Sequence, residues 1–140
     1  MTLMSCSCIL SAVPDFEVGQ QFAVERTFTD ALVDAFTEIS NDRGRHHLQP
    51  DAQGRRIVHG LLVASLGTQI GGSLNFLSRT MDYEFLRPVY VGDHVTCTAR
   101  IESVEKKPGK TRLLVSMRFV NQHGEDVIRG STRGAVLDAD

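Results

Sequence analysis

The stretch 57–72, IVHGLLVASLGTQIGG, decides the fold, because as a helix it would be apolar around nearly its whole circumference. Small residues such as Gly60, Ala64 and Gly67 are interspersed along it, and the pair Gly71-Gly72 predicts its end. A helix that is apolar on every face must be buried on every face. We therefore expect this helix at the centre of the domain, with other elements packed around it.

The half of the chain that follows this helix alternates between apolar and polar residues, which predicts strands. The alternation covers residues 81–85, 95–101 and 113–119, and a less regular strand is expected over 127–137. Turn sequences at 91–93, 107–110 and 121–125 separate these segments. Short turns of this kind predict an antiparallel sheet.

The segment before the apolar helix predicts one strand and one amphipathic helix. A weak period-2 pattern over 21–28 is compatible with a strand, and Thr29 is a suitable N-cap for a helix over 30–40. The apolar stripe of that helix is expected at Leu32, Ala35, Phe36 and Ile39. Helices grouped early and strands late give an α+β domain. A curved antiparallel sheet wrapped around one buried central helix, the hotdog fold, satisfies this order.

Composition limits the kind of protein. The 140 residues are 41% hydrophobic, which suits one domain, expected over 16–140, with residues 1–15 as a disordered leader. The formal charge of -2 gives no electrostatic case for nucleic acid or a membrane, and no apolar run approaches the roughly 18 residues of a membrane span. No basic residue precedes the apolar patch of the first residues, so we expect a cytoplasmic protein. Three cysteines without ligand spacing predict reduced thiols and no metal site.

Four stretches of the chain carry a resemblance to a known family. They are SNDRGRHH at 40–47, IVHGLLVASL at 57–66, FLRPVYVGDHV at 85–95 and VNQHGEDVIRG at 120–130. Their order and spacing resemble those of the MaoC-type, (R)-specific enoyl-CoA hydratases, and the resemblance extends from Phe16 onward. It implies a single hotdog domain that adds water, reversibly and with syn geometry, to trans-2-enoyl thioesters. It also implies a homodimer or a larger assembly of dimers, with coenzyme A or an acyl carrier protein as the carrier and no other cofactor.

The same resemblance assigns roles to individual residues. It places the catalytic pair on Asp42 and His47, five residues apart, and an orienting, substrate-binding hydroxyl on Thr68. Arg45 stands where the family usually has proline, and we expect it to bind the substrate and to favour polar acyl chains. Gly60 is the expected donor to the thioester oxygen, because backbone N–H groups at a helix start have no intrahelical partner.

These residue types suit hydration of an enoyl thioester. A carboxylate and an imidazole that hold one water between them can remove a proton from it and deliver a proton to Cα. Which of the two transfers the Cα proton stays open, because a coupled pair acts as a unit. We expect His46 to face solvent and His59 to have a structural role.

Two other functions remain open from the sequence. A hotdog acyl-CoA thioesterase would share the fold and ligand, although the usual helix carboxylate is missing, since 60–72 contain no Asp or Glu. A non-catalytic thioester-binding domain is the second alternative. The loop arginines, Arg43, Arg45, Arg55 and Arg56, could meet coenzyme A phosphates or a substrate carboxylate, or form a solvated loop face.

Overall fold

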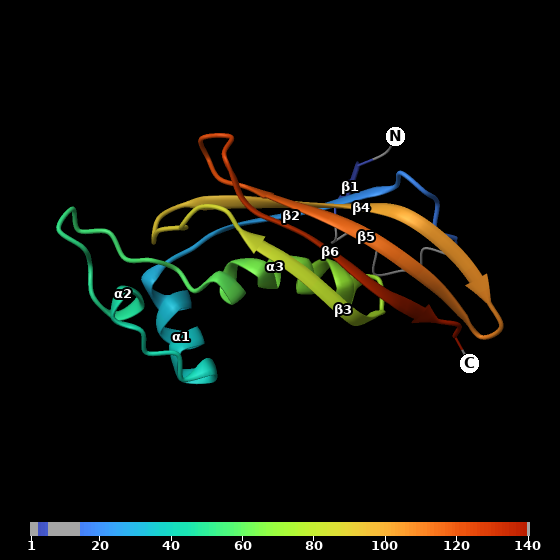
Figure 1. The fold of residues 1–140 in the computed structure, drawn as a ribbon, viewed down its shortest axis with the longest axis horizontal. Coiled ribbons are helices and arrows are strands. Elements are labelled where there is room, and N and C mark those ends of the chain that lie inside the picture. Colours follow the sequence, from blue (N-terminus) through green and yellow to red (C-terminus); the bar gives the residue numbers. More distant parts are fainter. Residues whose placement is uncertain (1–2, 6–14, 140) are drawn as a thin grey trace.

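The computed structural model describes residues 3–5 and 15–139. In chain order its elements are β1 (Leu3–Ser5), β2 (Gln21–Thr27), α1 (Asp30–Ser40), α2 (Arg45–Leu48), α3 (Gly60–Ser73), β3 (Phe76–Phe85), β4 (His94–Lys107), β5 (Lys110–Val120) and β6 (Asp126–Leu137). The strands form one sheet in the order β1-β2-β4-β5-β6-β3. The sheet is long and curved, with α3 along one of its faces and with α1 and α2 beyond one end (Figure 1). The predicted α+β hotdog fold is confirmed.

The sheet is antiparallel except at its first strand. β1 pairs in parallel with β2, through Leu3 opposite Gln21, and the four other strand pairs are antiparallel. Within the segment expected to be a disordered leader, Leu3–Ser5 form the strand β1, for which the edge of β2 supplies backbone partners. The other leader residues up to 14 lie outside the described residues.

The turns of the sheet follow the sequence signals. Gly92, Gly109 and Gly124 adopt φ angles of 99°, 79° and 76° in the three predicted turns. These angles lie in the left-handed region, which glycine enters without steric cost. The turns at Gly109 and Gly124 join neighbouring antiparallel strands, β4 to β5 and β5 to β6, whereas the turn at Gly92 leads into β4 from β3, which lies at the far edge of the sheet.

Helix α1 has the predicted limits but a different buried face. Thr29 caps it by accepting the N–H of Leu32 at 3.3 Å. Val33 and Thr37 are the buried residues, whereas Ala35 and Ile39, expected in the apolar stripe, are exposed. Thr37 can be buried because its hydroxyl donates to the carbonyl of Val33 at 2.8 Å.

Helix α3 packs one side against the sheet. Its buried residues are Leu62, Val63, Ala64, Leu66 and Ile70. Gly67 lets the helix approach closely, since a Cβ there would lie 2.8 Å from the sulfur of Met117. The prediction that this helix is buried on every face is wrong for the single chain, because one sheet covers only one side. Leu61 is 64% exposed, and Thr68 and Gln69 are exposed as well.

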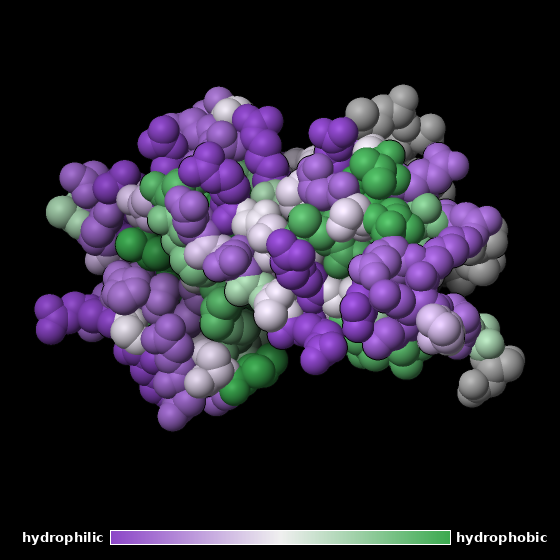
Figure 2. All heavy atoms as spheres, turned by 45° about the vertical axis from the view of Figure 1, so that its right-hand side comes forward, coloured by the Kyte–Doolittle hydropathy of each residue, from purple (hydrophilic) through white to green (hydrophobic). Residues whose placement is uncertain are grey.

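Apolar side chains also remain at the sheet edge formed by β3. Leu77, Met81 and Phe85 are each more than half exposed. Figure 2 shows apolar patches between the polar side chains on the face that it presents. In the part of the chain that the structure describes, no helix has the length and apolar character needed to cross a membrane.

Candidate active site

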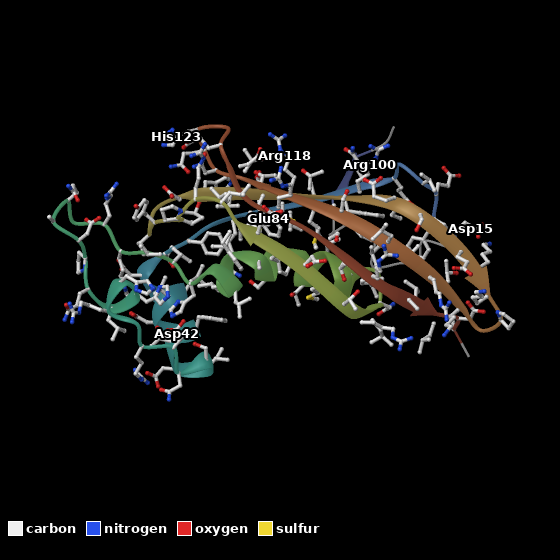
Figure 3. The ribbon with its side chains drawn as sticks, in the orientation of Figure 1. Asp15, Asp42, Glu84, Arg100, Arg118 and His123 are labelled. Atoms are coloured by element: carbon white, nitrogen blue, oxygen red, sulfur yellow. The ribbon has the colours of Figure 1, made fainter. Side chains whose placement is uncertain are left out.

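The end of α1 fixes the position of Asp42. Asn41 ends the helix in a left-handed conformation, with φ 56°, and donates its N–H to the carbonyl of Thr37 at 2.8 Å. The hydroxyl of Ser40 then accepts the N–H of Asp42 at 3.1 Å. The carboxylate of Asp42 accepts the N–H of Gly44, also at 3.1 Å. Asp42 thus lies at the end of the molecule that carries α1 and α2 (Figure 3).

The charge state of Asp42 follows from these contacts. The hydrogen bond from the Gly44 N–H lowers the pKa of Asp42 below its usual value, and the nearby rings of His47, His59 and His46 act in the same direction. Its side chain is 53% exposed. The free protein therefore presents an ionised carboxylate to the solvent at neutral pH.

His47 lies opposite this carboxylate, on the short helix α2. Its ring is buried, and Nδ1 lies 2.8 Å from the carbonyl oxygen of Ile57. A carbonyl can only accept, so Nδ1 carries the hydrogen and donates it. In the neutral ring Nε2 is then the acceptor nitrogen, and it lies 3.6 Å from Oδ2 of Asp42. Both atoms are acceptors, so they form no direct hydrogen bond with each other.

His59 supports both members of this pair. Its ring stacks on that of His47 with the centroids 3.8 Å apart and an interplanar angle of 19°. Its Nε2 donates to the backbone carbonyl of Asp42 at 3.0 Å, and Thr37 Oγ1 lies 3.5 Å from the same nitrogen. Nδ1 of His59 is buried without a hydrogen-bond partner among the described residues. The expected structural role thus takes a definite form: the ring holds the Asp42 backbone and supports the face of His47.

Arg56, expected either to bind an anionic group or to lie on a solvated loop face, is instead a positioning residue. Its guanidinium donates to Asp30 at 2.9 Å, to Asp34 at 2.6 Å and to the backbone carbonyl of His47. These hydrogen bonds, that to Asp34 first, raise the pKa of Arg56, so the group stays charged. Because its side chain is only 13% exposed, Arg56 belongs neither to a solvated loop face nor to a free phosphate site. It joins α1 to α2 and so fixes His47 relative to Asp42.

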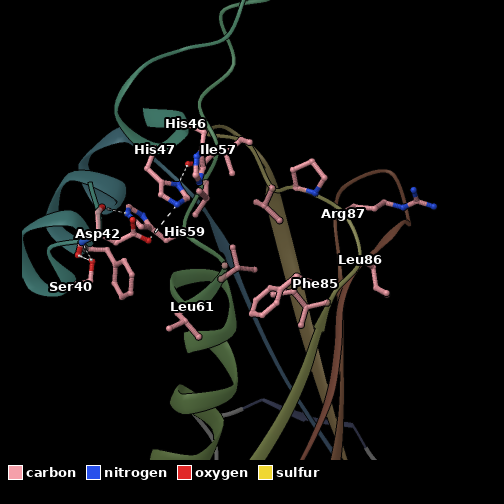
Figure 4. Close-up of a pocket in the computed structure, with 17 residues that line it drawn as sticks. Ser40, Asp42, His46, His47, Ile57, His59, Leu61, Phe85, Leu86 and Arg87 are labelled. Atoms are coloured by element: carbon pink, nitrogen blue, oxygen red, sulfur yellow. Dashed lines mark hydrogen bonds and ion pairs between the residues drawn. The ribbon is translucent and has the colours of Figure 1, made fainter. Parts of the chain in front are cut away.

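A cavity of about 660 Å³ opens beside these residues. Asp42, His47 and Gly60 line it together, so the structure brings the three expected catalytic residues to one space. The opposite side of the cavity carries Phe85 and the residues that follow it (Figure 4). The other lining residues are the polar Ser40, His46, His59 and Arg87 and the apolar Phe36, Ile57, Val58, Leu61, Val63, Leu86, Pro88, Val89 and Ile128. An apolar cavity with few polar groups is the usual form of a small-molecule site.

Gly60 begins α3, so its N–H has no intrahelical acceptor and lies at the positive end of the helix dipole. A Cβ at this position would lie 2.7 Å from the ring of Phe85. The absence of a side chain therefore lets the ring of Phe85 pack directly against the start of α3.

Thr68 and Arg45 lie outside this cavity. Thr68 is exposed on α3, two helical turns after Gly60, and the single chain does not place it behind the catalytic pair. Arg45 is exposed at the start of α2 and lines a neighbouring pocket. His46, expected to face solvent, is exposed, but it also lines the cavity, and its ring centroid lies 4.0 Å from that of His47.

Asp42, His47 and His59 also form a group whose ligand atoms lie within 4.8 Å of one another. The geometry does not fit a shared metal ion. An imidazole lone pair lies in the ring plane, so two nearly parallel stacked rings direct their lone pairs alongside each other and not to one point. In addition, Nε2 of His59 is occupied by the carbonyl of Asp42.

Comparisons with known proteins show the family of this chain. A family model described as the FAS1-like dehydratase domain region matches residues 51–129. The (R)-specific enoyl-CoA hydratase of Aeromonas caviae is 34% identical over 126 residues, which cover 81% of this chain and 90% of that protein.

Solved structures of (R)-hydratases are also similar to this chain. The (R)-hydratase from A. caviae involved in PHA biosynthesis superposes with a TM-score of 0.80 at 29% identity, covering 90% of this chain and all of that one. R-hydratase PhaJ1 from Pseudomonas aeruginosa gives a TM-score of 0.75 at 26% identity, with 89% of each chain covered. Fold, cavity and sequence therefore agree, and the chain belongs to the MaoC-like family of (R)-specific enoyl-CoA hydratases.

Proposed function

We propose that this protein is an (R)-specific enoyl-CoA hydratase, a hydro-lyase that adds water reversibly to trans-2-enoyl thioesters. The observation that carries the proposal is the pair of acceptors, Asp42 Oδ2 and His47 Nε2, that face each other at 3.6 Å beside an apolar cavity. A water molecule can sit about 2.8 Å from both atoms and donate one hydrogen to each. Its oxygen lone pairs are then free to attack a carbon atom in the cavity.

In the reaction, the water oxygen forms a bond to Cβ while one of its O–H bonds breaks. The proton passes to Asp42 or His47, and the π electrons move through Cα to the thioester oxygen. The resulting enolate takes a proton at Cα from the same pair, so both additions occur on one face. Each proton transfer by a positioned group contributes about 10² to 10⁴ in rate.

The backbone N–H of Gly60 stabilises the enolate oxygen. A preorganised donor of this kind is worth about 2.7 to 4 kcal/mol in the transition state. A bound acyl thioester would also cover the exposed carboxylate of Asp42. Removal of water from a carboxylate raises its pKa and makes it a stronger base, which offsets the effect of the Gly44 N–H.

The active unit in this proposal is a homodimer joined at β3. β3 is the last strand of the sheet, and its exposed Leu77, Met81 and Phe85 lie on an unpaired edge within the described chain. An edge of this kind invites pairing with a second copy. The partner would also cover exposed apolar residues such as Leu61 of α3. Coenzyme A or an acyl carrier protein is the carrier, and no further cofactor is required.

The compartment we propose is the cytoplasm.

Product analysis tests the proposal. With crotonyl-CoA as substrate we expect loss of the enoyl absorbance and formation of (R)-3-hydroxybutyryl-CoA, identified by chiral chromatography. Release of free coenzyme A without the hydroxy product would indicate a thioesterase. Binding of crotonyl-CoA without any product would indicate a non-catalytic domain.

A further inference from the structure

The four arginines of the loop after α1 differ in their partners. Arg43 pairs with Glu38 at 3.0 Å, Arg55 pairs with Asp51 at 2.9 Å, and Arg56 is held by its two aspartates. Arg45 is exposed, and its guanidinium makes no hydrogen bond or ion pair with any residue that the structure describes. It is the loop arginine whose charge is available to a ligand.

Arg45 lines a second pocket of about 390 Å³, the Arg45 pocket, which adjoins the catalytic cavity. Its lining residues are Arg45, His46, Gln49, Pro50, Asp51, Arg55 and Ile57. His46 and Ile57 also line the catalytic cavity, so the two spaces share a wall. His46 in that wall packs against the ring of the catalytic His47. Because His46 is exposed, a substrate whose reacting carbons lie beside His47 would reach Arg45 by passing over the solvent-facing side of His46.

The only carboxylate in the lining of the Arg45 pocket is already satisfied. Asp51 accepts the N–H groups of Gln53 at 2.9 Å and Arg55 at 2.8 Å, as well as Nε of Arg55. These bonds, the Arg55 backbone N–H first, lower the pKa of Asp51. The guanidinium of Arg55 in turn lies over the ring of Tyr90, 4.5 Å from its centroid. Asp51 and Arg55 thus neutralise each other, and Arg45 leaves the pocket with an unmatched positive charge.

We propose that the Arg45 pocket binds an oxyanion group of the substrate. The chemistry is a charge-assisted hydrogen bond from a guanidinium, which suits both phosphate and carboxylate. The group is either a phosphate of the carrier or a carboxylate at the far end of the acyl chain. This inference rests on the proposed hydratase function, because it assumes that an enoyl thioester occupies the catalytic cavity.

Two substrate pairs and three variants, one of them a control, test the proposal. The first pair, crotonyl-CoA and crotonyl-pantetheine, differs in the carrier phosphates. The second pair, trans-2-hexenedioyl-CoA and trans-2-hexenoyl-CoA, differs in the terminal carboxylate. Arg45→Ala removes the free guanidinium, Arg45→Gln keeps a polar side chain, and Arg43→Ala serves as the control because its guanidinium is paired with Glu38.

If the pocket binds phosphate, Arg45→Ala raises the KM of crotonyl-CoA about tenfold and leaves that of crotonyl-pantetheine unchanged. If it binds the acyl carboxylate, kcat/KM falls about tenfold for the hexenedioyl substrate and not for the hexenoyl one. Arg45→Gln should show the same selectivity, and Arg43→Ala neither effect.

For each substrate pair, the quantity compared is the ratio of the two kcat/KM values. The proposal is overturned if Arg45→Ala changes the ratio of neither pair, or if Arg43→Ala changes the ratios as much as Arg45→Ala does. Its failure is distinct from failure of the proposed function. If only the Arg45 pocket proposal fails, the unmodified protein still hydrates crotonyl-CoA. If the proposed hydratase function fails, the unmodified protein hydrates none of the four substrates.

Discussion

At the scale of single residues, the site depends on which nitrogen of each histidine carries a hydrogen. The carbonyls of Ile57 and Asp42 accept from His47 Nδ1 and His59 Nε2, so two backbone groups set both tautomers. The first bond directs the acceptor nitrogen of His47 towards Asp42. The second holds the backbone of Asp42 in place.

His59 should therefore act as a positioning residue through its N–H. His59→Phe keeps a ring for stacking but leaves the carbonyl of Asp42 without its donor, whereas His59→Gln can still donate. We expect the Phe variant to lose up to about a hundredfold in kcat with little change in KM, as displaced catalytic groups do. The Gln variant should retain most of kcat. If both variants lost kcat equally, the ring volume of His59 and not its hydrogen bond would be the important feature.

The lowered pKa of Asp42 predicts how stability depends on pH. A carboxyl whose pKa is lower in the folded than in the unfolded state stabilises the fold above the unfolded pKa, about 3.9. That contribution is lost as the pH falls through the folded pKa. Asp42→Asn does not titrate, so we expect the Tm of the natural protein to fall relative to that of the variant between pH 6 and pH 3. Thermal unfolding of both proteins measures this difference, and a rise in the relative Tm of the natural protein would contradict it.

At the scale of elements, the sequence predicted most of the fold. Local sequence patterns predicted the N-cap Thr29 and the limits of α1, the three glycine turns and the four later strands. These features depend on residues that are close together in the sequence. The pairing of Leu3–Ser5 and the helix α2 could not be predicted, because tertiary contacts stabilise them. The positioning role of Arg56 could not be predicted for the same reason, since its partners Asp30 and Asp34 lie 26 and 22 residues away. Asp42, His47 and Gly60 were placed in one site by family motifs and not by local pattern.

The start of α3 allows a direct test of the proposed oxyanion donor. Proline is tolerated at the first position of a helix, and the ψ angle of His59, 131°, suits a residue before proline. Gly60→Pro removes the N–H, whereas Gly60→Ala keeps it and adds only bulk against Phe85. We expect the Pro variant to have a kcat about 10² to 10³ lower than the Ala variant. Equal kcat values in the two variants, with unchanged circular dichroism, would remove Gly60 from the mechanism.

At the scale of the whole molecule, one sheet is too narrow to bury α3 alone. Leu61 on that helix and Met81 on the edge strand are 64% and 53% exposed, and a second copy could cover both. The same contact would give β3 a strand partner. The protein should therefore be most stable and active as a dimer.

Met81→Asp places a charge on the β3 edge and should convert the dimer to a monomer at micromolar concentration. Val18→Asp is the matched control, since Val18 is 62% exposed in a turn outside β3. Light scattering coupled to size exclusion gives the mass of each variant. A monomeric natural protein, or a Met81→Asp variant that stays dimeric, would show that the β3 edge is not the interface.

The central claim is that Asp42 and His47 together activate one water molecule. The most direct measurement is kcat/KM for hydration of crotonyl-CoA by the variants Asp42→Asn, His47→Gln and His46→Gln. The first two should lose at least about a hundredfold, the loss expected for removal of a general acid or base. His46→Gln should change kcat/KM little, because His46 lies beside the pair and takes no part in proton transfer. Full activity in either of the first two variants, or a loss confined to His46→Gln, would contradict the account.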